Sequence, residues 1–115
     1  MNKKTITTAQ IGDVLVVTAV PASLDVRNSK LFRAEVEDVI QSKKNVVLDL
    51  AAVEFMDSSA LGVLIPLLRS LSSRDGDLRL CGLQPRVQML FELTRLYKVF
   101  PIWPSPEAAA QSYES

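Results

Sequence analysis

The stretch EFMDSSALGVLIPLL, residues Glu54–Leu68, decides the fold, because three polar residues separate two apolar segments there. Asp57, the first of the three, is a favoured N-cap, since its carboxylate can accept hydrogen bonds from the free N–H groups of a first helical turn. Beyond it, apolar residues recur on almost every side of a helical repeat. This pattern predicts a helix from about Ser58 to about Ser72 that is buried on more than one face or shows one face to a partner.

The hydroxyl groups of Ser58 and Ser59 admit two interpretations. In the simpler one they only start the helix, as short polar side chains at this position usually do. In the other, Ser58 is a modification site, because a phosphate adds about −1.5 to −2 charges close to the positive end of the helix dipole. The backbone N–H groups there could partly accommodate that charge without unfolding the domain. A partner that packs against this turn would then be repelled.

The segments around this stretch alternate between strand and helix patterns. Strands are expected at Thr5–Thr8, Val14–Val20, Asn45–Leu50, Leu78–Gly82 and Val99–Trp103. Further helices are expected around Phe32–Ile40, from Pro85 onward and over Ser105–Glu114. Strands that alternate with helices imply right-handed crossovers. The sequence therefore predicts an α/β fold, a single domain over residues 1–115, with a mixed, mostly parallel sheet of about five strands, about four helices and the order ββαβαβαβα.

The composition is that of an ordinary globular domain, with 115 residues, 48% hydrophobic and 23% charged. Thirteen basic residues balance thirteen acidic ones, so no strong field favours direct contact with nucleic acid or an anionic membrane. The longest apolar run is too short for membrane insertion. No apolar segment follows the first lysines, so a secretory signal is not expected. The lone Cys81 suits a reducing compartment, and we expect a cytoplasmic protein.

Several residue types that catalysis commonly uses are missing. The chain has no histidine and one cysteine, so it cannot assemble a Ser-His-Asp or Cys-His catalytic group by itself. The nitrogen and sulfur ligands usual for zinc are also missing, and no Gly-rich phosphate-binding loop occurs. Chemistry with two carboxylates stays formally open, but no spacing singles out a pair. We therefore expect neither an enzyme nor a bound cofactor or metal.

Some residues outside the central stretch are assigned structural roles. Trp103 is expected to pack in the core rather than to form a ligand platform, and Cys81 is expected to be a small buried hydrophobe. Asp25 or Asn28 is expected to cap the first helix. Three arginines are expected to be solvated, namely Arg69, Arg74 and Arg79.

The segment NVVLDLAAVEFMDSSALGVLIPLLRSL, residues Asn45–Leu71, resembles the signature of STAS domains, specifically of bacterial anti-sigma factor antagonists. The resemblance covers essentially the whole chain, and its core is the run DSSALG at Asp57–Gly62. It implies a STAS-type fold and a partner switch. The unmodified antagonist binds an anti-sigma factor that is also a serine kinase, which frees a sigma factor. The kinase then phosphorylates the antagonist and lowers binding, and a serine phosphatase reverses the modification.

Carried onto this chain, the resemblance makes Ser58 the phosphorylation site. It implies a partner-binding surface made of Asp25, Asp57, Ser58, Ser59, Leu61 and Gly62. Asp25 is included because Ser23-Leu24-Asp25 looks like a family loop that lies near the phosphorylation site. The chain departs from the family pattern at Ala60, where many members have glycine, and in the loop before Leu24. The sequence does not decide whether the protein forms a homodimer.

A second function is compatible with the same resemblance. STAS domains also serve membrane systems that transport lipids or anions, and some of them keep a hydroxyl residue near this turn. Because the chain contains no membrane-spanning pattern, it would be a separate soluble subunit of such a system. The neighbouring genes, which would encode either a kinase-like anti-sigma factor or a transporter, discriminate between the two.

Overall fold

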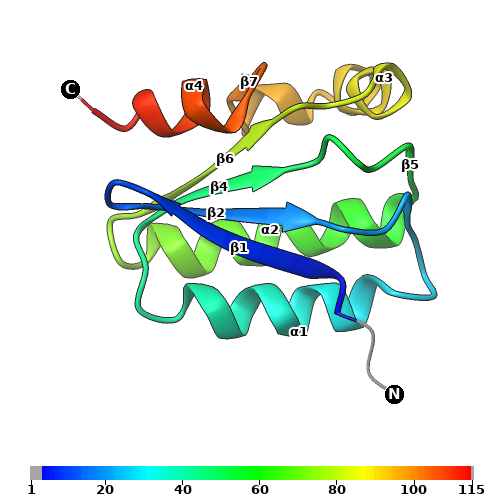
Figure 1. The fold of residues 1–115 in the computed structure, drawn as a ribbon. Coiled ribbons are helices and arrows are strands. Elements are labelled where there is room, and N and C mark those ends of the chain that lie inside the picture. The colour runs from blue at the N-terminus through cyan, green and yellow to red at the C-terminus, as the bar shows by residue number, and fades with distance from the viewer. Residues whose placement is uncertain (1–3, 115) are drawn as a thin grey trace.

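The computed structural model describes residues 4–114 and is built on a five-stranded sheet with the order β1-β2-β4-β6-β7 (Figure 1). The strands are β1 (Ile6–Ile11), β2 (Val14–Ala19), β4 (Asn45–Asp49), β6 (Asp77–Cys81) and β7 (Ile102–Trp103). β1 runs antiparallel to β2, and every other neighbouring pair in this sheet is parallel. The predicted mixed, mostly parallel sheet is confirmed.

Helices cover both faces of the sheet. α1 (Ser29–Ile40) and α2 (Ser58–Ser72) pack against each other below it in Figure 1, whereas α3 (Pro85–Leu93) and α4 (Pro106–Gln111) lie above it. The element order matches the predicted ββαβαβαβα pattern once two very short strands and a short 3-10 helix are set aside. The α/β fold class is therefore confirmed.

Three short elements were not predicted. β3 (Ser23–Leu24) and β5 (Phe55–Met56) form a separate two-stranded parallel sheet, and a 3-10 helix, η1, covers Leu96–Lys98. The last strand is shorter than the predicted Val99–Trp103, because Val99 ends the 3-10 helix. β1 is longer than predicted and extends to the hairpin turn at Gly12.

The core is divided by the sheet into two layers. On the α1 and α2 side, the fully buried large side chains include Phe32, Ile40, Leu64, Leu67 and Leu71. On the α4 side, a smaller cluster contains Cys81, and Trp103 packs against its edge. The prediction that Cys81 is a buried hydrophobe is confirmed, whereas Trp103, which was predicted to pack in the core, is only partly buried. Burial raises the pKa of the Cys81 thiol to about 12, so this thiol is unreactive at neutral pH.

Two of the three arginines expected to be solvated are bound to the protein, so that prediction is wrong for them. Arg74 Nη2 donates to the carbonyl oxygen of Ile40 at 2.6 Å, which ties the end of α2 to the end of α1. Arg79 pairs with Asp77 at 3.1 Å, and its guanidinium lies 4.0 Å from the ring centroid of Tyr113. Arg69 is exposed as predicted.

Candidate functional site

Asp57 organises the start of α2 and also holds the loop that precedes α1. Its Oδ1 accepts hydrogen bonds from the backbone N–H groups of Ser59 at 2.9 Å and Ala60 at 3.1 Å, and from the Ser59 hydroxyl at 2.5 Å. Its Oδ2 accepts from the backbone N–H of Val26 at 3.0 Å. The predicted N-cap is confirmed, and the same carboxylate joins two segments that are 31 residues apart.

Asp25 is only 8% exposed and is held within its own loop. Its carboxylate accepts from the Ser23 hydroxyl and from the Arg27 guanidinium, both at 2.7 Å. The predicted capping role differs in detail. Asn28 occupies the N-cap position of α1, but its side chain bonds backward to Ser23 and Asp25 instead of capping the helix. The N–H of Ser29, at the start of α1, donates instead to the backbone carbonyl oxygen of Asp25 at 2.8 Å.

The small β3–β5 sheet brings these two acidic residues to the same end of the molecule. Leu24 pairs with Met56, and the backbone N–H of Asp57 donates to the carbonyl oxygen of Leu24 at 3.1 Å. Asp25 and Asp57 therefore follow directly after two paired strands. In Figure 1 this end carries β5 and the start of α2. The sequence placed Asp57 in the turn directly, but it placed Asp25 near the turn only through the family resemblance, since a two-residue strand has no periodicity to detect.

Ser58 and Ser59 differ sharply in their surroundings. Ser58 is exposed, and within residues 4–114 its hydroxyl has no hydrogen-bond partner. The Ser59 hydroxyl is instead committed to Asp57. Gly62, one turn further along α2, is exposed, whereas Leu61 is only 8% exposed and lies in the core. Leu61 therefore supports this surface from beneath and offers a partner little contact area.

Two exposed apolar side chains flank the turn. Phe55 is 44% exposed and precedes Asp57, while Val26 is 73% exposed and sits on the loop held by Asp57. Met56, between Phe55 and Asp57, is buried. We call Val26, Phe55, Ser58 and Gly62 the switch surface. Sequence analysis did not identify Val26, because only the bond from its backbone to Asp57 places it here.

The carboxylates of Asp57 and Asp25 are both stably ionised. The Ser59 hydroxyl, together with three backbone N–H groups, lowers the pKa of Asp57 below its ordinary value despite partial desolvation. The Arg27 guanidinium, followed by the Ser23 hydroxyl, lowers the pKa of Asp25 well below its usual range. Both groups therefore carry negative charge at neutral pH. An anion added at Ser58 would lie beside the Asp57 carboxylate, whereas the charge of Asp25 is paired with the Arg27 guanidinium at 2.7 Å.

Asp57→Asn is expected to make the stability of the protein less dependent on pH. Because folding lowers the Asp57 pKa, its charged form stabilises the fold above the unfolded value of about 3.9, and this contribution is lost as pH falls through the folded pKa. The variant should melt at a lower temperature than the wild type near pH 7, and the gap should narrow toward pH 3. Thermal melts followed by circular dichroism measure both.

Asp75→Asn is the matched control for that experiment. Asp75 is an exposed turn residue with φ 63°, a conformation that asparagine also tolerates. Its substitution removes one carboxylate without touching the α2 start, so its gap from the wild type should change less with pH. An Asp57→Asn gap that stays constant from neutral to acidic pH would contradict the role assigned to the charge.

A hollow elsewhere on the molecule does not involve this turn. This hollow, of about 590 Å³, is lined by Gln88, Glu92, Tyr97 and Ile102, and none of the switch-surface residues lines it. Among residues 4–114, no cluster of three histidine, cysteine or acidic side chains could hold a metal ion. In the same part of the chain, no helix has both the length and the apolar character needed to cross a membrane.

Comparison with known proteins gives a consistent result. The model of the STAS domain family matches residues 5–109. The chain is 29% identical over 91 residues to the anti-sigma F factor antagonist of Paenibacillus polymyxa, covering 77% of this chain and 78% of that protein. The crystal structure of an anti-sigma factor antagonist from Mycobacterium paratuberculosis superposes with a TM-score of 0.86 at 25% identity, covering 96% of this chain and 94% of the other.

A membrane protein shares the fold over part of its length. Murine Slc26a9, an anion transporter, superposes with a TM-score of 0.76 at 22% identity. The match covers 90% of this chain but 18% of the transporter. At this identity the similarity concerns the fold alone.

Proposed function

Because this chain belongs to the STAS domain family, we propose that it is an anti-sigma factor antagonist, a non-enzymatic regulator that works by exchanging partners. In its unmodified state it binds an anti-sigma factor that is also a serine kinase, here called the anti-sigma kinase. The observation that carries the proposal is the contrast between an exposed, unbonded Ser58 hydroxyl and a Ser59 hydroxyl held by Asp57. The free hydroxyl is the phosphate acceptor.

In the proposed reaction, Ser58 Oγ attacks the γ-phosphorus of ATP bound to the kinase. The bond from this phosphorus to the β,γ-bridging oxygen breaks, ADP leaves, and the hydroxyl proton passes to the kinase or to water. This chain contributes the nucleophile and its position, while the kinase supplies the nucleotide and the catalytic groups. A serine phosphatase later hydrolyses the phosphate ester and restores the binding form.

The surroundings of Ser58 explain why the phosphate would weaken binding. The N–H groups of Ser59 and Ala60, which could have neutralised an anion at the helix start, already donate to Asp57. The phosphate would therefore place a dianion beside the Asp57 carboxylate without compensation from these two N–H groups. A kinase surface that covers Val26, Phe55 and Gly62 in the unmodified state would have to desolvate that charge. Release follows from repulsion and desolvation, without any change of fold.

Site mapping tests the proposal directly. Incubation with a candidate anti-sigma kinase and ATP should add one phosphate, which peptide mass spectrometry should locate at Ser58. Ser58→Ala should abolish the modification, and Ser59→Ala, the neighbouring control, should retain it. With a kinase that is active on another antagonist, label found on Ser59 or on neither serine would exclude the assignment.

The proposal also names the residues at the kinase contact and the compartment in which the chain acts. Asp25, Asp57, Ser58, Ser59 and Gly62 are proposed to lie in or directly beside the kinase contact, with Leu61 beneath it. The chain is proposed to act in the cytoplasm, where sigma factors act, without direct contact to nucleic acid. The alternative, a soluble subunit of a lipid or anion transport system, has weaker support, because the similarity to the transporter concerns the fold alone.

A further inference from the structure

The free edge of the main sheet, along β1, lacks the features that usually protect such edges. β1 is the first strand in the sheet order, so within residues 4–114 no strand pairs with its outer side. Its sequence, ITTAQI, contains no charge and no proline. Its register with β2 is unbroken from Ile6↔Ala19 to Ile11↔Val14, so it has no bulge. Charges, prolines and bulges are the means by which proteins prevent pairing of edges.

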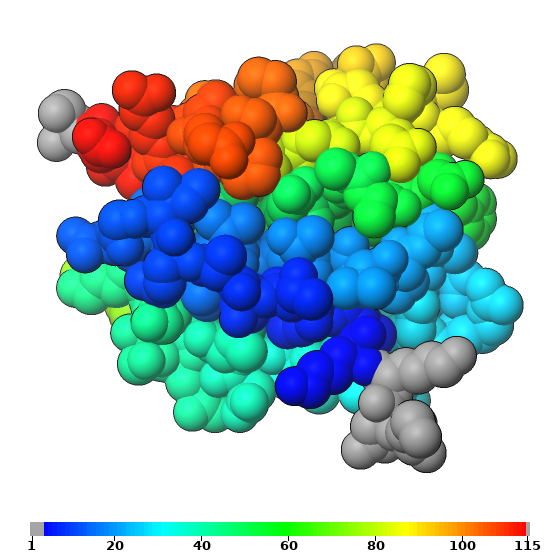
Figure 2. All heavy atoms as spheres, viewed as in Figure 1, coloured from blue at the N-terminus to red at the C-terminus, as the bar shows by residue number. Residues whose placement is uncertain are grey.

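The hydrogen-bond pattern identifies which backbone groups of β1 face outward. Val20 N–H donates to the carbonyl oxygen of Thr5 at 2.8 Å, so these two residues form a hydrogen-bonded pair. Because such pairs alternate along an antiparallel ladder, Ile6, Thr8 and Gln10 direct their N–H and C=O groups away from β2. These three residues form the outer edge of β1. Figure 2 shows the β1 segment, in dark blue, open across the front of the molecule.

We propose that the outer edge of β1 pairs antiparallel with the outer edge of β1 in a second copy of this chain. The two-fold axis passes between the two Thr8 residues, which places Ile6 of each copy opposite Gln10 of the other. Each opposed pair exchanges two N–H···O bonds, and this register uses all the outward-facing groups. The two sheets then form one continuous sheet. The inference does not depend on phosphorylation of Ser58.

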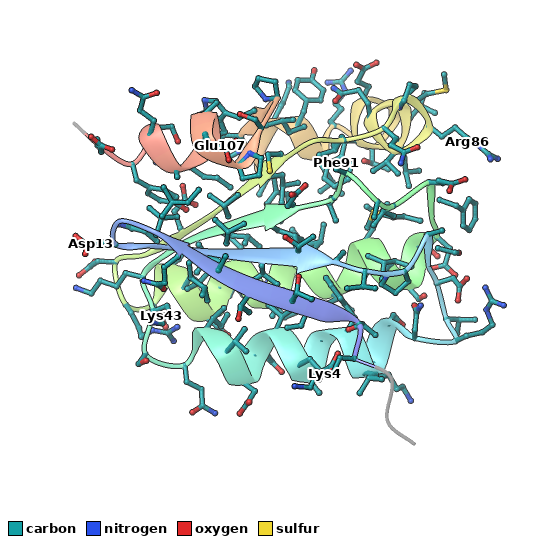
Figure 3. The ribbon with its side chains drawn as sticks, in the orientation of Figure 1. Lys4, Asp13, Lys43, Arg86, Phe91 and Glu107 are labelled. Atoms are coloured by element: carbon teal, nitrogen blue, oxygen red, sulfur yellow. The ribbon has the colours of Figure 1, made fainter. Side chains whose placement is uncertain are left out.

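Charge complementarity favours a second copy in this orientation. Lys4 lies just before β1 and Asp13 just after it, at opposite ends of the strand in Figure 3, and both are exposed. In the antiparallel register Lys4 of each copy lies opposite Gly12 and beside Asp13 of the other, and symmetry repeats this contact. A parallel arrangement would instead bring the two Lys4 residues together. Every copy of the chain carries both complementary charges.

The space beside β1 also suits the proposed neighbour. A hollow of about 280 Å³ lies between β1 and α1 and is lined in part by Ile6, Thr8, Glu35 and Asp38. Opposed residues in a ladder share one face of the sheet, so the Gln10 side chain of the second copy points to the same face as Ile6. Its amide would find carboxylate acceptors from α1 at this hollow.

Cysteine crosslinking tests the register. Two Thr8 residues in a hydrogen-bonded pair would have Cα atoms about 5.5 Å apart, within the range of a disulfide. Thr8→Cys should therefore form a covalent dimer under mild oxidation. The matched control is Gln10→Cys on the same edge, which should crosslink much less because each Gln10 faces Ile6. The native Cys81 is buried and does not interfere. Equal crosslinking of the two variants would overturn the proposed register.

Thr8→Pro tests the interaction without any crosslink. Proline removes an outward N–H that β2 does not use, and edge strands tolerate it. Sedimentation equilibrium should show that the wild type self-associates as its concentration rises. The dimer Kd of the variant should be roughly tenfold higher or more, because the two-fold symmetry removes two hydrogen bonds. A wild type that stays monomeric up to its solubility limit would disprove the proposal. If Thr8→Pro fails to fold, as judged by circular dichroism, the comparison of crosslinking between Thr8→Cys and Gln10→Cys tests the proposal instead.

Discussion

Ser58→Asp is expected to weaken binding to the anti-sigma kinase by about 1–3 kcal/mol, or roughly 5- to 150-fold in Kd. The introduced carboxylate would lie beside Asp57, whose pKa is lowered and whose charge therefore persists. The N–H groups of Ser59 and Ala60 already donate to Asp57, so these two groups cannot neutralise a second anion. Isothermal titration calorimetry with the purified kinase measures the change. Ser58→Ala should bind the kinase with wild-type affinity. Added ATP should not lower this affinity, because no hydroxyl is left at residue 58 to accept a phosphate.

Ser58→Asn separates the effect of charge from that of size. Asparagine has almost the same shape as aspartate and is neutral, so it should bind much more tightly than Ser58→Asp if repulsion drives release. Equal weakening by the two variants would indicate a steric contact instead of a charge switch. Wild-type affinity in both variants would place Ser58 outside the interface, which would remove the physical basis of the proposed partner exchange.

Gly76→Ala is expected to destabilise the fold by about 2 kcal/mol or more, as overpacking against a rigid neighbour does. A Cβ at this position would lie 2.2 Å from the carbonyl oxygen of Lys44, which is a backbone atom and cannot move aside alone. That same oxygen accepts a hydrogen bond from Asp77 N–H at 2.9 Å and so aligns the start of β6 with the start of β4. Urea unfolding should show a lower midpoint with an unchanged slope.

Gly62→Ala is the matched control, because the same substitution should have the opposite sign there. Gly62 lies inside α2, and a Cβ at this position meets no atom within 4 Å outside its local helix backbone. Alanine should therefore stabilise the helix by about 0.5–1 kcal/mol. Two glycine-to-alanine changes of equal effect would contradict the close approach described at Gly76.

The main elements could be predicted from the sequence because each carries its own periodic pattern. The apolar residues of Asn45–Asp49 and the helical repeat after Ser58 are strong local signals, and both elements were predicted. β3 and β5 were missed because two-residue strands exist only through their pairing across the chain. Arg74 was misjudged for a related reason, since its acceptors lie 31 and 34 residues away.

The candidate site was predicted in part. The N-cap role of Asp57 follows from residue type and position, and the structure confirms it. The sequence could not show that the Ser59 hydroxyl bonds to Asp57 while the Ser58 hydroxyl stays free, because either hydroxyl can bond to an N-cap aspartate. Val26 could not be found at all, since its place beside the turn depends on one hydrogen bond between distant segments.

The packing of Arg79 near Trp103 has a practical consequence for spectroscopy. Trp103 is the chain's single tryptophan, and the Arg79 guanidinium lies 5.5 Å from its ring centroid. Trp103 also packs against the cluster that contains Ala109 and Ala110 of α4, so the emission of Trp103 should report on whether this helix remains attached to the sheet. The Ser58 turn begins α2, on the opposite face of the sheet, so intrinsic fluorescence can follow detachment of this layer without an added dye.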